Sequence, residues 1–198
     1  MYLKELFETW QLEPLLIATA TTGLSCVTDK VIALGTNDTK ESKLIFQKVS
    51  REELLPAQRY HCISEQQVLQ QGLDTPLFVE KVTEALEGKF LMSYNPLFQY
   101  KFLSELLEEQ DLQIYDLSVI EQAVRKGLSF TEEELVSASS FYKSCTALYF
   151  PLSINTICRN LKMAKQPAPG ELPLERSLDV LQRLYTSASS REVQILQS

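Results

Sequence analysis

Between residues 15 and 49 the chain carries three short apolar runs that are separated by turn residues. The first run, Leu-Leu-Ile at 15–17, leads into the turn sequence Thr-Thr-Gly at 21–23. This pattern predicts strands over 15–19, 30–35 and 43–49. The spacing of the three strands is typical of hairpins, so the chain should begin with neighbouring strands of one sheet.

Helical patterns alternate with further apolar runs downstream. Phe78, Val82 and Leu86 lie along one face of a helix that starts at Asp74-Thr75-Pro76. We expect strands over 90–94 and 112–115, and helices over 2–12, from Ser64, over 75–87, over 96–109 and over 117–126. Three hairpin-like strands followed by strand, helix and strand predict an α/β fold, a mixed sheet of about five strands flanked by helices.

The chain beyond Gly127 has a mostly helical pattern. Pro151 and the Pro-Ala-Pro-Gly linker at 167–170 interrupt it. The expected helices cover 132–144, 154–163 and 174–185. We find no internal repeat, and a length of 198 residues suits one compact domain, or one domain with an appendage.

Charge and cysteine usage exclude several classes of function. With 26 acidic and 19 basic residues the formal net charge is −7, so no global positive field attracts nucleic acid. The basic residues at 125–126 and 159–165 leave open the alternative of a local positive patch. His61 is the only histidine and the four cysteines have no CxxC spacing, so we expect reduced thiols and no zinc site.

The N-terminus is acidic and amphipathic, without the basic start and long apolar core of a signal peptide. No stretch approaches the roughly 20 apolar residues of a membrane helix. We therefore expect a soluble, cytoplasmic protein with no membrane contact. Leu6, Phe7 and Trp10 repeat at helical spacing, so the first helix should dock on the domain with Trp10 at least partly buried.

Four ordered segments are similar to those of a known family. LLIATATTGL at 15–24 resembles a strand that ends in Asp-x-Glu-Thr-Thr-Gly-Leu, and RYHCIS at 59–64 resembles a His-x-Ile-Ser/Thr segment. SYNPLFQYKFL at 93–103 resembles Asn-x-x-Phe-Asp-x-x-Phe-Leu, and FPLSINTICRNLKM at 150–163 resembles a Ser-Leu-x-x-Leu-Cys helix. The chain thus resembles the DEDDh 3'-5' exonucleases of the DnaQ-like, proofreading epsilon-subunit type.

The resemblance implies a ribonuclease-H-like fold. It also divides the chain into a helical extension over 1–14, an exonuclease-like domain over 15–188 and a tail over 189–198. The catalytic positions of the family fall on Ala18, Ala20, Gln99 and Ser177, and the general-base histidine position falls on Leu172. None of the five carries the residue of the family.

These substitutions bear directly on chemistry. Hydrolysis in the family needs carboxylates, because two divalent ions about 4 Å apart must activate water and stabilise the leaving oxygen. Alanine offers no ligand, glutamine and serine offer only neutral oxygens, and leucine takes no proton from water. We expect no catalytic residue, no bound metal and no cofactor; Mg²⁺ or Mn²⁺ is expected only if a divergent active site exists.

A shell of nucleotide-binding residues remains. In the family, the loop after the first strand and the His-x-Ile segment border the terminal nucleotide. The matching residues here are Thr21, Thr22, Gly23, Leu24, His61 and Ile63. The expected partners are single-stranded nucleic acid or a nucleotide, or a protein.

Other active-site arrangements remain open at this stage. A slipped register in the third motif would use Glu175 or Asp179, two residues from Ser177. A new site would use Asp29, Asp38, Glu41 or Asp116. We therefore expect a catalytically inactive exonuclease-like domain that acts as a scaffold or as a partner- or nucleic-acid-binding module. The alternative is a weak, divergent, metal-dependent 3'-5' exonuclease on single-stranded DNA or RNA.

Overall fold

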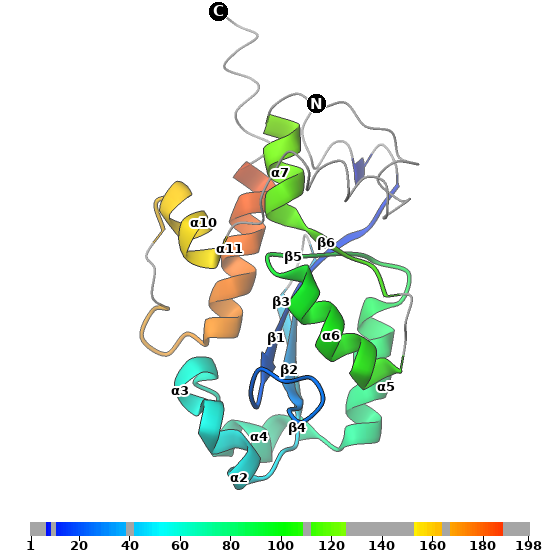
Figure 1. Ribbon diagram of the computed structural model, residues 1–198, viewed down its shortest axis with the longest axis vertical. Coiled ribbons are helices and arrows are strands. Elements are labelled where there is room, and N and C mark those ends of the chain that lie inside the picture. Colours follow the sequence, from blue (N-terminus) through cyan, green and yellow to red (C-terminus); the bar gives the residue numbers. More distant parts are fainter. Residues whose placement is uncertain are drawn as a thin grey trace, which may run out of the picture.

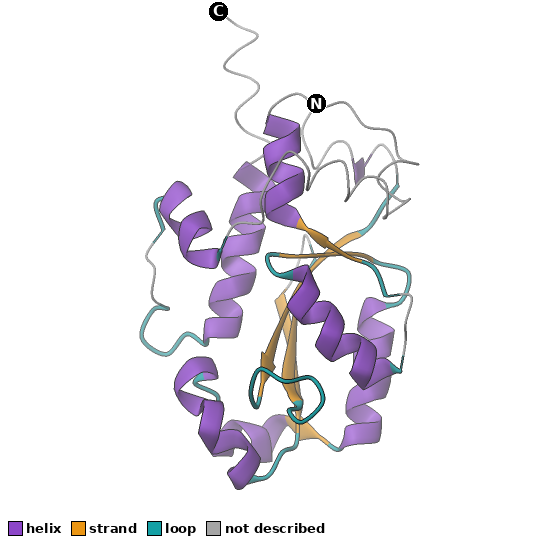
Figure 2. Ribbon diagram, in the orientation of Figure 1, coloured by secondary structure: helices purple, strands orange, loops and turns teal. Residues whose placement is uncertain are grey.

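A mixed sheet runs through the molecule (Figure 1, Figure 2). The computed structural model describes residues 7–8, 11–38, 42–108, 112–125, 153–163 and 167–187. Within these residues the sheet has six strands in the order β4-β3-β2-β1-β5-β6. Their bounds are β1 Pro14–Thr21, β2 Val31–Asn37, β3 Ser42–Gln47, β4 Gly72–Leu73, β5 Phe90–Ser93 and β6 Ile114–Asp116. The expected α/β class is confirmed.

The first three strands pair antiparallel in sequence order, as their spacing predicts. Ala18 of β1 lies opposite Gly35 of β2, and Leu34 of β2 lies opposite Ile45 of β3. β5 joins β1 in parallel, and β6 joins β5 in parallel. The carboxyl ends of β1, β5 and β6 therefore lie at one edge of the sheet, where open α/β sheets usually bind ligands.

The strand that the sequence pattern did not predict is β4. It consists of Gly72 and Leu73, which pair in parallel with Phe46 and Gln47 of β3. Two residues are too few to carry a recognisable alternation of apolar and polar side chains. A Cβ on Gly72 would lie 2.3 Å from the carbonyl oxygen of Val68, so this close approach of the chain requires a glycine.

Helices cover both faces of the sheet. Their bounds are α2 Arg51–Leu54, the 3-10 helix η1 Leu55–Ala57, α3 Gln58–His61, α4 Glu65–Gln71, α5 Thr75–Leu86, α6 Pro96–Leu107, α7 Leu117–Arg125, α10 Ile154–Asn160 and α11 Pro173–Ser187. The last six α-helices of this series match helices expected from the sequence. The helix expected over 132–144 lies outside the described residues.

The segment over 51–61 folds into three short helices that the apolar pattern did not predict. Ser50 starts the series with a capping box, because its hydroxyl accepts from the Glu53 amide at 3.3 Å and its own amide donates to Glu53 Oε2 at 2.8 Å. The series ends at Cys62, whose φ of 57° stops α3 in the left-handed conformation. The Ser-x-x-Glu spacing was the available signal.

The two faces of the sheet bury separate apolar clusters. Figure 1 places α5 and α6 on one side of the sheet and α10 and α11 on the other. Leu15 and Ile17 of β1 pack with Phe78 and Leu103 on the first side, whereas Ala18 and Ala20 pack with α11 on the second. This division follows the two-residue alternation of side chains along a strand.

Of the N-terminal segment through Trp10, the structure describes Phe7 and Glu8. The Phe7 ring is buried, with ring centroids 5.1 Å from Phe90 and 6.3 Å from Tyr185. Trp10 and the expected tail over 189–198 lie outside the described residues.

Two further findings concern the described part of the chain alone. Cys26, Cys62 and Cys158 are free thiols there. Among the same residues, the structure contains no helix with the length and apolar character needed to cross a membrane.

Candidate functional site

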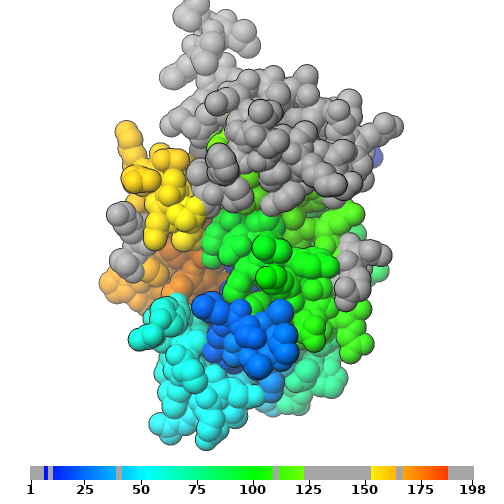
Figure 3. Space-filling model, in the orientation of Figure 1, coloured from blue at the N-terminus to red at the C-terminus, as the bar shows by residue number. Residues whose placement is uncertain are grey.

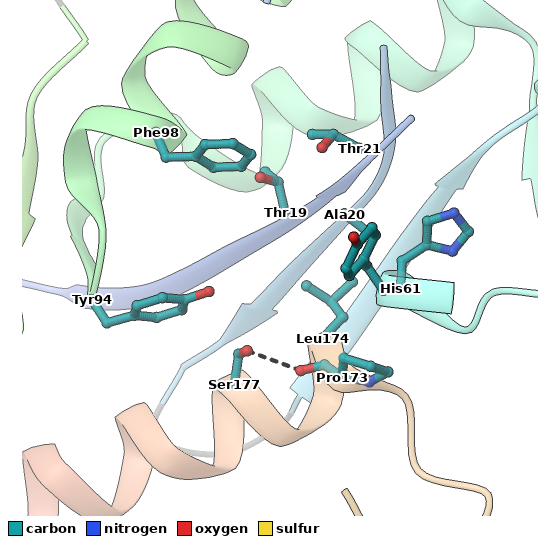
Figure 4. Close-up of a pocket in the computed structure, with 10 residues that line it drawn as sticks. Thr19, Ala20, Thr21, His61, Tyr94, Phe98, Pro173, Leu174 and Ser177 are labelled. Carbon is teal, nitrogen blue, oxygen red and sulfur yellow. Dashed lines mark hydrogen bonds between the residues drawn. The ribbon is translucent and has the colours of Figure 1, made fainter. Parts of the chain in front are cut away.

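A pocket of about 210 Å³ opens where β1 ends (Figure 4). Four separate segments line it: the end of β1, helix α3, the junction of β5 and α6, and the start of α11. The lining residues are Thr19, Ala20, Thr21, Tyr60, His61, Tyr94, Phe98, Pro173, Leu174 and Ser177. The pocket therefore lies at the strand edge where ligands of α/β proteins usually bind.

The end of β1 contributes three consecutive residues to this pocket. In a regular strand, the Ala20 side chain would point away from the side of Thr19 and Thr21. The pairing of β1 with β2 shifts register between Ala20 and Thr21, which interrupts the alternation. This irregularity accounts for Ala20 and Thr21 bordering the same cavity, whereas Thr19 reaches it from the side of α6, where its hydroxyl donates to Gln99.

Three of the five positions that the resemblance assigns to catalysis lie in one apolar cluster. Ala18, Ala20 and Leu172 are 1%, 7% and 7% exposed and pack together with Leu174 and Leu178 of α11. Charged side chains placed there would lose their hydration without gaining a partner. The local environment therefore suits neutral residues.

The other two positions hold polar side chains that are engaged within the protein. Gln99 is 1% exposed, and its Oε1 accepts a hydrogen bond of 2.8 Å from the Thr19 hydroxyl. The Ser177 hydroxyl donates to the carbonyl oxygen of Pro173, one helical turn earlier, at 2.9 Å (Figure 4). Only Ala20 and Ser177 of the five positions line the pocket.

The titratable groups His61 and Tyr94 are neutral near neutral pH. Burial raises the pKa of the Tyr94 phenol, and the nearby Ser177 hydroxyl opposes this rise. Burial lowers the pKa of the His61 imidazole, and the nearby Leu54 carbonyl partly offsets the effect. The Asp, Glu, Lys and Arg side chains of the described residues do not line the pocket. It is therefore a neutral cavity of aromatic, aliphatic and hydroxyl groups.

His61 holds the local backbone in place. Its Nδ1 accepts a hydrogen bond from the Ile63 amide at 3.0 Å, and Ile63 itself is completely buried in the apolar cluster. The His61 Nε2 atom is buried and has no hydrogen-bond partner in the described part of the chain. The Leu54 carbonyl thus acts on the ring as a nearby dipole.

The β1–β2 loop contains the remaining residues of the expected nucleotide-binding shell. The Thr21 hydroxyl donates to the Gly23 carbonyl at 2.5 Å, and the Thr22 hydroxyl accepts from the Lys30 amide at 2.8 Å. Leu24 is 87% exposed. Figure 3 shows this loop, in blue, on the surface between the cyan segment of α2–α4 and the green α6.

Gly23 is required by a close approach within the same loop. A Cβ at this position would lie 2.4 Å from Oδ2 of Asp29. That oxygen accepts a hydrogen bond from the Ser25 amide at 2.8 Å, which closes the loop. Of the expected binding shell, Thr21 and His61 line the pocket, whereas Thr22, Gly23, Leu24 and Ile63 do not.

The acidic residues considered for another metal site are dispersed or engaged. Asp29 closes the β1–β2 loop, and Asp116 accepts from the Ser118 and Val119 amides at the start of α7. Asp38 is exposed, and Glu41 lies outside the described residues. The described residues contain no group of three or more His, Cys, Asp or Glu side chains able to hold a metal ion.

The two acids near Ser177 also have partners. Glu175 accepts from the Leu172 amide at 2.9 Å, which caps α11. Asp179 accepts from Arg176 and from Arg183, each at 3.1 Å. A slipped register of the third motif would make Glu175 or Asp179 a metal ligand, and either carboxylate would then have to give up these hydrogen bonds.

The sequence pattern missed much of the pocket lining. Phe98 is the phenylalanine of the Asn-x-x-Phe segment, and Tyr60 and Tyr94 lie next to His61 and Asn95, which the resemblance also singled out. The resemblance assigned no binding role to these three aromatic residues. That they line one pocket is a product of tertiary structure.

Sequence comparison gives no family assignment. No protein-family model matches the chain, and no curated protein sequence matches it.

Solved structures share its fold. E. coli exonuclease I in complex with a dT13 oligonucleotide aligns with a TM-score of 0.59 and 11% identity, covering 94% of this chain and 43% of that one. S. pombe Pop2p in its Mg²⁺- and Mn²⁺-bound form aligns with a TM-score of 0.54 and 10% identity, covering 98% of this chain and 92% of that one.

A chain from the structure of the yeast NOT1 MIF4G domain co-crystallised with CAF1 aligns with a TM-score of 0.56 and 10% identity, covering 98% of this chain and 84% of that one. This chain spans less than half the length of the E. coli exonuclease I chain. The neighbours are DnaQ-family 3'-5' exonucleases, so the expected ribonuclease-H-like fold is confirmed. At this identity the likeness establishes the fold alone.

Proposed function

We propose that this chain is an exonuclease-fold module that binds the end of a single-stranded nucleic acid without hydrolysing it. One observation carries the proposal: Ala18 and Ala20, at the carboxylate positions of the resemblance, and Leu172, at its general-base histidine position, pack in one apolar cluster. A two-metal site needs several carboxylates to offset the charge of its cations. The described residues around this pocket provide none.

The pocket itself supports a binding role. Its volume of about 210 Å³ and its lining by Tyr60, Tyr94 and Phe98 suit a planar ring that stacks on aromatic side chains. Hydroxyl groups of Thr19, Thr21 and Ser177 border the same cavity and can form hydrogen bonds with base edges or sugar. The neighbours with this fold include one in complex with a dT13 oligonucleotide.

A protein-binding scaffold is the second candidate. The observation that favours it is the β1–β2 loop, where Leu24 and Val27 are 87% and 85% exposed. Exposed apolar side chains close together often mark a contact with another protein.

The deciding experiment combines binding and cleavage on one preparation. A fluorescent single strand is titrated with the protein in chelator, and a parallel sample with Mg²⁺ or Mn²⁺ is resolved on a sequencing gel. We expect metal-independent binding and an intact strand. Shortening from the 3' end that stops in chelator would establish the divergent exonuclease instead. An intact strand with no binding would reject the nucleic-acid role and favour the scaffold.

A further inference from the structure

Tyr60 is an aromatic side chain that the fold leaves uncovered beside the pocket. It is 66% exposed and also borders the cavity. The short helix that carries it is anchored at both ends, because Ala57, which precedes the helix, is buried and His61, its last residue, is 5% exposed. The ring is therefore held at the surface by a fixed backbone.

Arg59 lies against this ring. Its guanidinium carbon is 4.6 Å from the Tyr60 ring centroid, and Nη2 donates to the Tyr60 hydroxyl at 2.6 Å. A guanidinium at this distance is attracted to the electron-rich face of an aromatic ring. The two exposed side chains thus form one unit at the pocket mouth.

No other described residue neutralises the charge of Arg59. Other cations of this region are engaged: Lys30 pairs with Glu53 at 2.5 Å, and Arg51 lies 3.8 Å from Glu65. Within the described ranges Arg59 has no ion-pair partner. In a protein with a net charge of −7, a guanidinium that has no ion-pair partner among the described residues and lies next to a pocket is a local exception to the acidic composition.

Hydrogen bonds hold the backbone under this pair in place. The Cys62 amide donates to the Gln58 carbonyl at 2.8 Å, and the Gln58 side-chain amide donates to the Ile63 carbonyl at 3.2 Å. Ile63 is fully buried beneath them. A stacking surface on such a base loses little conformational freedom on binding.

We propose that Arg59 and Tyr60 form a platform for single-stranded nucleic acid at the mouth of the pocket, with Tyr60 stacking on a base and Arg59 contacting the adjoining phosphate. Stacking on an exposed aromatic ring and a charge-assisted contact with phosphate are the two interactions that hold single strands without sequence preference. This platform extends the pocket outward and rests on the nucleic-acid role proposed above.

The test measures fluorescence anisotropy of a labelled 12-nucleotide DNA strand and of its RNA counterpart, in chelator and over a range of salt concentrations. Tyr60→Ala should weaken binding by about five- to a hundredfold, the range found for loss of one stacked base. Tyr60→Phe keeps the ring and should retain most of the affinity. Arg59→Ala should weaken binding and lower the salt slope by about 0.7, as expected for one lost phosphate contact on a single strand.

Arg183→Ala is the matched control, because Arg183 is exposed on α11, lies outside the basic groups at 125–126 and 159–165, and does not line the pocket. It should bind like the wild type. Wild-type binding that is unchanged by Arg59→Ala and Tyr60→Ala would overturn the platform while leaving the nucleic-acid role intact. Wild-type protein that binds neither strand would overturn both proposals. Both altered side chains are exposed, so the variants should keep the wild-type melting temperature.

Discussion

The Thr19 hydroxyl donates a hydrogen bond of 2.8 Å to Oε1 of Gln99, linking β1 to α6 across 80 residues of sequence. Gln99 is 1% exposed at the position where the resemblance expects an aspartate. A carboxylate could accept the same bond, but it would carry its charge into a buried site that has no cation. The neutral amide keeps the contact without this penalty.

Gln99→Glu tests this interpretation. The new carboxylate keeps an acceptor for Thr19, but burial should raise its pKa, so that the ionised form destabilises the fold. Because the pKa of the new carboxyl is higher in the folded state than in the unfolded state, the variant loses stability as the pH increases through the folded-state pKa. We expect the variant to lose about 1–3 kcal/mol more stability at pH 8 than at pH 5 relative to wild type. Urea denaturation at both values measures this difference, and equal losses would contradict it.

The sequence predicted the sheet better than the site. Strands over 15–19 and 30–35 carry apolar runs that are strong enough to define them locally, and the structure pairs them as expected. The two residues of β4 and the short helices over 51–61 carry no comparable pattern, because tertiary contacts hold them.

The pocket depends still more on tertiary structure. Tyr94 and Ser177 are 83 positions apart in sequence, yet both line one cavity. Sequence similarity pointed to Ser177, His61 and Phe98, but it could not reveal that they would line one cavity together with Tyr60 and Tyr94. Aromatic residues in a sequence are more often part of the core than of a pocket lining. Only the folded structure shows which of these two positions each ring takes.

Gly23→Ala should destabilise the β1–β2 loop. A Cβ at residue 23 would approach Asp29 Oδ2 to 2.4 Å and displace the carboxylate from the Ser25 amide. We expect a loss of about 1–2 kcal/mol, the cost of one disrupted hydrogen bond with local strain. In an Asp29→Ala background the same substitution should cost less. Chemical denaturation of the four proteins completes this cycle, and equal costs in both backgrounds would exclude the contact as the cause.

Asp116 should make stability fall as the pH rises. Burial raises the pKa of its carboxyl to about 6, against the hydrogen bonds from Ser118 and Val119 that favour the charged form. The folded pKa is higher than the unfolded value, so the protonated fold is favoured at low pH and this contribution is lost as the pH increases through about 6.

Asp116→Asn should remove this dependence while its amide oxygen still caps α7. The difference in unfolding free energy between variant and wild type should shift in favour of the variant by about 1–3 kcal/mol from pH 4 to pH 8. Because His61 keeps its lowered pKa in both proteins, its opposite pH dependence cancels in the comparison. Denaturant midpoints across this pH range measure the shift; a constant difference would contradict the assignment to Asp116.

Phe7→Ala should show how strongly the N-terminal segment contributes to the core. The ring is 1% exposed and makes edge contacts with Phe90 and Tyr185. Removing it should cost about 3–5 kcal/mol through lost burial and the cavity left behind. Leu24→Ala is the control, since Leu24 is 87% exposed and its removal should change stability by less than about 0.5 kcal/mol. Similar urea midpoints for the two variants would mean that Phe7 does not hold the segment to the domain.

Restoring charge at the pocket should create a metal site at the expense of stability. Ala20 and Ser177 are the two positions of the resemblance that line the cavity, and they are 7% and 9% exposed. The double variant Ala20→Glu, Ser177→Asp places two carboxylates there with no described cation to balance them. Mutual repulsion and burial should lower its melting temperature in chelator.

Mn²⁺ should recover part of that loss in the double variant and leave the wild type unchanged, because a ligand that binds only the folded state raises the melting temperature. Ala33→Asp, at a buried alanine of the same apolar cluster that the resemblance does not assign to catalysis, controls for charge burial alone. It should be destabilised without recovery by Mn²⁺. Completing the set with Ala18→Asp, Gln99→Asp and Leu172→His should strengthen Mn²⁺ binding, with weak nuclease activity at most, since the residues that orient the ligands are not in place. Stabilisation of the wild type by Mn²⁺ to the same extent as the double variant would reject the neutral-site interpretation.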